Sequence, residues 1–130
     1  MSALLDDIET FFINSGLLSE YEFQFGLWDE EKNEKAKRYF VVQQASGGKA
    51  EPWFRQPNYR LIFVSKANEA FAGAPNLVGE VANDTIEYIR ENFSSDKHAF
   101  IEALTDPVGP IKTKDNRSIY EFTIRTFTRR

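Results

Sequence analysis

The spacing of hydrophobic and polar positions predicts a definite order of helices and strands in the N-terminal third of the chain. Over 3–15, apolar side chains recur every three to four residues, the spacing of a helix with one buried face, and Gly16 ends the run. Over 21–27, aromatic and leucine residues alternate with polar residues and glycine. That period of two predicts a strand with one apolar face. The charged stretch 29–38 is then expected to be an exposed turn.

The middle of the chain predicts a long β-hairpin. Continuous apolar runs, rich in β-branched and aromatic residues, occupy 39–45 and 59–65. Such runs favour strands that are partly covered on both faces, as happens when helices pack on a sheet. The connection over 46–58 is rich in glycine and proline and long for a hairpin. Long loops of this kind are usually functional or disordered.

The C-terminal half predicts one further helix and two further strands. A helix is expected over 77–93, with an apolar stripe that ends at Phe93 and polar residues opposite. A short strand over 100–104 stops at Asp-Pro, a tight polar turn follows at 114–117, and alternation over 120–125 predicts the final strand.

These elements predict an α+β fold with the order α-β-β-β-α-β-β. The sheet is expected to be mixed but rich in antiparallel pairs, to contain the long hairpin, and to be packed by the N-terminal helix and the central helix. A length of 130 residues suits one domain over 1–130 and is too short for two. Twelve phenylalanines provide aromatic surface for a core, for an interface, or for both.

Composition narrows the compartment and the chemistry. The chain has no cysteine, which excludes a disulfide framework and thiolate catalysis. Its first residues carry acids where a signal peptide carries bases, and no apolar run reaches the ~20 residues needed to cross a bilayer. We therefore expect a protein that acts inside the cell or inside a virion, without a membrane partner.

Charge is distributed unevenly along the sequence. The net charge of −4 argues against a dedicated nucleic-acid binder. Residues 1–31 contain eight acids and no base, whereas 111–130 contain six bases and two acids. The favoured interpretation is that these charges keep the protein soluble. The alternative is that they form complementary faces on neighbouring copies, whose head-to-tail contacts close into rings.

No pattern in the sequence predicts a catalytic, cofactor-binding or metal-binding residue. His98 has Ser and Asp neighbours but no nucleophile elbow, so it is expected to be a solvated histidine at a helix end. The acidic runs at 6–7 and 29–31 are expected to be solvated faces. Residues 46–49 superficially resemble a phosphate loop, but the glycine spacing is too short and prolines follow where a helix is required.

The candidate interface consists of the hairpin tip and the basic C-terminal strand, because aromatic and arginine side chains together have the composition of interface hot spots. Its residues are Gly47, Gly48, Trp53, Phe54, Arg55, Arg125, Arg129 and Arg130.

With the element order above, the Phe-Val-Val-Gln-Gln segment at 40–44 and the Asp-Asn-Arg turn at 115–117 before an alternating strand make the chain resemble the tail terminator proteins of long-tailed bacteriophages. The resemblance implies a hexameric ring that stacks on the tail tube, stops polymerisation and offers a surface to the head. It implies no catalysis and no cofactor. The implied partners are further copies of the chain, a tail tube protein and a head–tail connector protein, with DNA only passing through the ring. The implied location is the virion tail, after assembly in the host cytoplasm.

Other functions remain open at this point. The chain also suits another small head–tail completion protein or a tail tube subunit, which would form filaments where a terminator stops at a ring. A small α+β ligand-binding domain, enzyme or interaction module is a further alternative. A ligand site or an active site needs a convergent polar cluster, and the sequence offers no candidate beyond His98.

Overall fold

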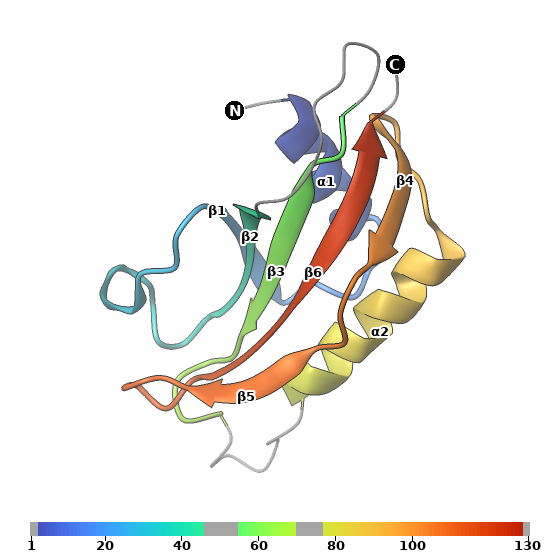
Figure 1. The fold of residues 1–130 in the computed structure, drawn as a ribbon. Coiled ribbons are helices and arrows are strands. Elements are labelled where there is room, and N and C mark those ends of the chain that lie inside the picture. Colours follow the sequence, from blue (N-terminus) through green and yellow to red (C-terminus); the bar gives the residue numbers. More distant parts are fainter. Residues whose placement is uncertain (1–2, 46–54, 70–76, 129–130) are drawn as a thin grey trace.

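The computed structural model describes residues 3–45, 55–69 and 77–128, which form two helices and a six-stranded mixed sheet (Figure 1). The elements are α1 (Ala3–Ile13), β1 (Tyr21–Phe25), one turn of 3-10 helix (Glu30–Lys32), β2 (Arg38–Ala45), β3 (Asn58–Val64), α2 (Leu77–Glu91), β4 (His98–Ala103), β5 (Val108–Lys112) and β6 (Ser118–Thr128).

The strand order in the sheet is β1-β2-β3-β6-β4, and β5 pairs with β6 beside β4. Strands β1 and β2 are parallel, and every other pair is antiparallel. In the β2–β3 hairpin Tyr39 faces Val64 and Ala45 faces Asn58. The α+β class, the long hairpin and the element order are therefore confirmed.

Strand β5 is the one element of the described sheet that the sequence pattern did not predict. Its sequence is Val-Gly-Pro-Ile-Lys, and all five residues are exposed. Because no face of this strand is buried, its hydrophobic pattern does not alternate and gives no signal. Its pairing with β6 also shifts register between Val108 and Ile111.

The two faces of the sheet are covered differently. Helices α1 and α2 cover one face, where the main core includes Phe12, Phe40 and Phe63, all fully buried. Figure 1 looks onto the other face, with α1 behind β3 and β6. Trp28 packs there on a second cluster. This cluster consists of Tyr39, Val41, Ile62 and Val64.

Several expectations about element ends were wrong. Strand β1 ends at Phe25, so Leu27 lies beyond its apolar face and is 90% exposed. Arg38 is not part of an exposed turn, because it begins β2 and is buried. Its guanidinium nitrogens lie 2.8 Å from Oε1 of Glu69 and 2.6 Å from Oε2 of Glu20. Helix α2 ends at Glu91, two residues before the predicted end. Phe93 consequently leaves the apolar stripe of the helix and is 53% exposed.

Gly79 permits close packing of α2 on the sheet, and this gives a first prediction. A Cβ at Gly79 would lie 2.8 Å from the ring of Tyr120, and a Cβ at Gly109 would lie 2.7 Å from the same ring. Because Tyr120 is held between two glycines, its ring has little room to move. We expect Gly79→Ala to lower the free energy of unfolding by about 1 kcal/mol in urea titrations, although alanine favours helices over glycine by about 1 kcal/mol.

The control for this prediction is the same substitution in a Tyr120→Ala background. Without the ring, Gly79→Ala should stabilise the protein. Equal effects in both backgrounds would show that the contact with Tyr120 does not matter.

Candidate interaction surface

The structure describes two of the eight predicted interface residues, Arg55 and Arg125. The other six, Gly47, Gly48, Trp53, Phe54, Arg129 and Arg130, lie outside the described residues.

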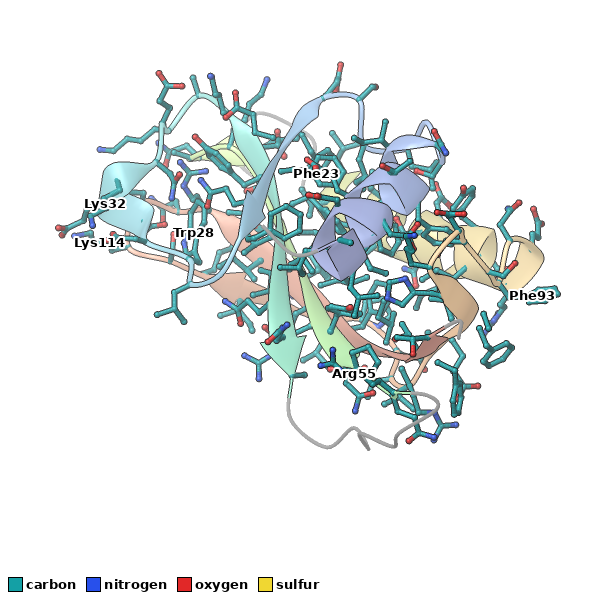
Figure 2. The ribbon with its side chains drawn as sticks, turned by 90° about the horizontal axis from the view of Figure 1, so that it is seen from above. Phe23, Trp28, Lys32, Arg55, Phe93 and Lys114 are labelled. Atoms are coloured by element: carbon teal, nitrogen blue, oxygen red, sulfur yellow. The ribbon has the colours of Figure 1, made fainter. Side chains whose placement is uncertain are left out.

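Arg55 and Arg125 lie toward the same end of the sheet. The amide of Arg55 donates to Oγ1 of Thr128 over 3.0 Å, and the amide of Thr128 donates to the Arg55 carbonyl over 2.9 Å. The chain returning from the hairpin loop therefore lies beside the end of β6 (Figure 2). Arg125 faces Asn58 across the β3–β6 pair and binds the carboxylate of Glu102 on β4. Both arginines are exposed.

Three phenylalanines form a row beside these arginines, which we call the aromatic row (Phe93, Phe100, Phe127). The ring centroids of Phe93 and Phe100 are 6.1 Å apart, and those of Phe100 and Phe127 are 6.2 Å apart. The guanidinium carbon of Arg125 lies 5.9 Å from the Phe127 centroid. The row runs from the residues after α2, across β4, to β6, and Phe93 and Phe100 are 53% and 37% exposed.

A groove of about 330 Å³ lies between the C-terminal end of α2 and β4. Its lining is mostly apolar and includes Ile89, Phe93, Phe100 and Ile101. Strand β4 is the last strand in the sheet order, and no described strand pairs with its outer side. The segment after α2 covers part of that side, because the amide of Ile101 donates to the carbonyl of Phe93 over 2.8 Å. Exposed apolar side chains at an open strand edge are typical of surfaces that bind other proteins. Aromatic and arginine residues are also enriched at interface centres.

The sequence pattern did not reveal the aromatic row. Phe93 was assigned to a buried helix stripe, and the contact of Phe100 with Phe127 depends on the pairing of β4 with β6. The sequence offered one signal, because Phe93 stands at the predicted end of a helix and Phe100 at the predicted start of a strand.

His98 is not the solvated histidine that its polar neighbours predicted. Its side chain is fully buried, with Nδ1 2.6 Å from Oδ2 of Asp7 and Nε2 3.2 Å from the Tyr59 hydroxyl. The expectation for Asp7 was also wrong, since its side chain is only 8% exposed. Both ring nitrogens of His98 are hydrogen-bonded, and the ring has no exposed surface. His98 therefore links α1 to β3 and β4, and no part of its ring is open to a ligand.

Burial determines the ionisation of this cluster. Desolvation lowers the pKa of His98, although the neighbouring Asp7 carboxylate opposes the shift. Burial raises the pKa of Tyr59 to about 12, so its hydroxyl stays protonated. The neutral imidazole then donates from Nδ1 to Asp7 and accepts at Nε2 from Tyr59. For Asp7, burial acts to raise the pKa, but the hydrogen bonds from Ser95 and His98 outweigh it and the pKa is lowered.

Much of the uneven charge is paired within the chain. Oε1 of Glu31 lies 2.5 Å from Nζ of Lys114, and Oε1 of Glu30 lies 3.6 Å from Nε of Arg117. The Glu30 side chain is only 12% exposed, so this residue of the 29–31 run is not on the solvated face that was expected. Figure 2 shows Lys32 and Lys114 together at the end of the molecule opposite Phe93. Glu20 and Glu22 also have basic partners in β2 or the turn before it. These acids of the N-terminal third are therefore matched by their own chain before any neighbour arrives.

Other classes of site find little support in the described ranges 3–45, 55–69 and 77–128. They contain no group of three or more residues with metal-ligating side chains. No helix in these ranges is long and apolar enough to cross a membrane.

Comparison with known proteins identifies the family. No curated protein matches the chain. The sequence profile described as "Phage tail termination protein" matches residues 1–130, the whole chain. The chain therefore belongs to the phage tail termination protein family, which gives it a role in ending the phage tail.

Proposed function

We propose that the protein caps the phage tail tube as a ring of six identical subunits, ends tail polymerisation and provides the surface to which the head joins. The observation that carries the proposal is the exposed aromatic row at the outer edge of β4, in a chain whose family acts in tail termination. Exposed aromatic side chains at a sheet edge, with the Arg125 guanidinium beside Phe127, support contact with another protein.

Sheet topology is compatible with a ring. The two edges of the sheet lie at opposite ends of the strand order, with β1 at one edge and β4 and β5 at the other. Contacts between two different surfaces of identical subunits are head-to-tail, and they close into a ring when the rotation between subunits permits. A closed ring leaves no unpaired surface on which further subunits of its own kind add.

The candidate interface retains its place in this proposal. Arg55 and Arg125 contribute to the surface near the C-terminal end of β6. The remaining residues of the candidate interface, Gly47, Gly48, Trp53, Phe54, Arg129 and Arg130, are proposed contacts to the tube or to a neighbouring subunit. The tail tube protein binds one side of the ring and the head–tail connector binds the other. DNA passes through the ring without a dedicated binding site. Assembly takes place in the host cytoplasm and requires no cofactor or catalysis.

Deletion of the gene from its phage tests the proposal. Without a terminator, tails should grow beyond their normal length and remain without heads in electron micrographs, and supplying the intact gene should restore normal length. Normal virions after deletion would refute the role. Heads without any tails would place the protein at an earlier step than termination.

The aromatic row gives a sharper form of the test. Phe93→Ala combined with Phe100→Ala should fail to restore tail length, because both side chains are exposed and their loss removes contact area with little effect on the fold. The matched control is Leu27→Ala, which removes a side chain that is 90% exposed outside the row. Restoration by the double variant as complete as by the control would remove the row from the interface.

A further inference from the structure

The helix side of the molecule has an excess of negative charge. Helix α2 exposes Glu80, Asp84, Glu87 and Glu91 at intervals of three to four residues, which places them along one side of the helix. Arg90 pairs with Glu87 over 2.7 Å. Glu80, Asp84 and Glu91 have no basic partner in the described ranges, so most of this acidic side of α2 is unmatched there.

The opposite face of the sheet carries exposed arginines. Arg60 on β3 alternates with the buried Tyr59 and Leu61, so its side chain lies on the face away from the helices. Arg60 faces Thr123 on β6, and Arg125 is two residues further along that strand, on the same face. Diagonal neighbours of this kind are about 7–8 Å apart.

The part of this face that carries Arg60 and Arg125 lacks the cover that Trp28 gives to the other half. Trp28 packs over the cluster formed by Tyr39, Val41, Ile62 and Val64, in the other half of the same face. Arg60 is exposed, and no acidic partner for it lies in the described part of the chain. We call this half of the face the open face (Gln43, Arg60, Thr123, Arg125).

We propose that the open face of one subunit receives the acidic side of α2 from the next copy of the chain, and that this contact joins neighbours in the ring. The inference rests on the proposed ring and names the surfaces that build it. The two surfaces lie on opposite sides of one sheet, so each subunit uses both at once and the contact is head-to-tail. Unmatched acids on one surface and unmatched arginine on the other give electrostatic complementarity.

A second copy fits this face better than a polyanion does. Glu102 binds Arg125 on the open side of the sheet, and Glu121 lies on the same side of β6. A nucleic acid would bring phosphates against both carboxylates, and the chain carries a net charge of −4. The acidic side of α2 instead brings three unpaired carboxylates at helical spacing, and their target is Arg60, the arginine of the open face that has no acidic partner among the described residues.

Charge reversal tests the contact in the phage that lacks the gene. Arg60→Glu should reduce the yield of normal-length tails at least tenfold, because like charges opposed across an interface are strongly unfavourable. Glu80→Arg combined with Asp84→Arg should do the same, and all three substitutions together should restore the yield. Lys66→Glu is the control, since it makes the same charge change at an exposed position after β3.

The outcomes separate this inference from the proposed function. Normal tails in the gene deletion refute the terminator role, and the inference with it. If the deletion gives overlong tails, and Arg60→Glu restores their normal length as well as Lys66→Glu does, the inference alone is refuted. Failure of the triple variant to restore yield, while its circular dichroism shows a folded protein, also overturns the pairing of the two surfaces.

Crosslinking provides a second measurement that does not depend on tail length. The chain has no cysteine, so Arg60→Cys with Asp84→Cys introduces the only two thiols. These positions lie on opposite sides of the sheet and cannot join within one subunit. Oxidation of assembled tails should give covalent multimers larger than dimers on denaturing gels, whereas each single variant should give dimers at most. Absence of larger multimers from the double variant contradicts the contact.

Discussion

Arg117→Ala is expected to lower the free energy of unfolding by about 3–5 kcal/mol, the cost of removing a buried charged side chain from its partners. Arg117 has no exposed surface and is the largest fully buried side chain of the described residues. Its guanidinium donates to the carbonyls of Glu34, Lys37 and Ser65 over 2.6, 3.1 and 2.8 Å. Alanine would leave these carbonyls without their donor.

The aromatic contacts of Arg117 explain why lysine should not replace it. The guanidinium carbon lies 5.2 Å from the centroid of the Trp28 ring and 5.7 Å from the centroid of the Tyr39 ring. A planar guanidinium can stack on these rings while its nitrogens donate in several directions, whereas an ammonium group cannot do both. Arg117→Lys should therefore lose most of the same stability.

Urea unfolding at neutral pH measures these losses. The matched control is Arg60→Ala, an arginine removed from an exposed strand position, with an expected change below about 0.5 kcal/mol. The segment between β1 and β2 should lose protection against amide hydrogen exchange in Arg117→Ala, because Arg117 ties its carbonyls to the sheet. A loss below about 1 kcal/mol would show that the buried charge is dispensable.

Arg117 also shows where sequence reasoning stops. Its turn, Lys-Asp-Asn-Arg, was correctly predicted as polar, yet Arg117 points inward from the end of that turn. Its acceptors are backbone carbonyls from two distant segments, which leave no trace in side-chain patterns. By contrast, the hairpin was predictable because apolar β-forming residues fill both of its strands, so local preference and burial agree.

The candidate surface was predictable only in part. Arg125 could be placed on an exposed strand position by alternation, and the structure adds that Arg55 lies beside the end of that strand. The aromatic row depends on how β4 aligns with β6 and on where α2 ends, and neither follows from local pattern. The same limitation affected His98, whose partners Asp7 and Tyr59 come from α1 and β3.

His98→Ala should lower the free energy of unfolding at neutral pH by about 2–4 kcal/mol. The substitution leaves a cavity, and it removes the donor of Asp7 and the acceptor of the Tyr59 hydroxyl at the same time. Thermal unfolding followed by circular dichroism measures the loss. Lys97→Ala, at the exposed neighbouring position, is the control and should change stability by less than about 0.5 kcal/mol.

The buried histidine also fixes the sign of a pH dependence. In the folded protein the pKa of His98 is lowered from 6.5, chiefly because burial disfavours the charged ring. Below pH 6.5 the unfolded chain therefore binds a proton that the folded protein binds only at lower pH, so stability falls as pH decreases through this window. The slope for one proton is at most about 1.4 kcal/mol per pH unit.

Unfolding titrations of the intact protein and of His98→Gln between pH 7.5 and about 5 isolate this contribution, because histidine is the side chain whose ordinary pKa lies in that range. His98 is the only histidine in the chain. The variant should be less stable than the intact protein at pH 7.5 but should lose less further stability on acidification. Asp7, whose pKa is also lowered, adds a loss of stability only at still lower pH, as its carboxylate becomes protonated. Parallel pH profiles for the two proteins would mean that His98 titrates alike in the folded and unfolded states, which would contradict its burial as a neutral ring between Asp7 and Tyr59.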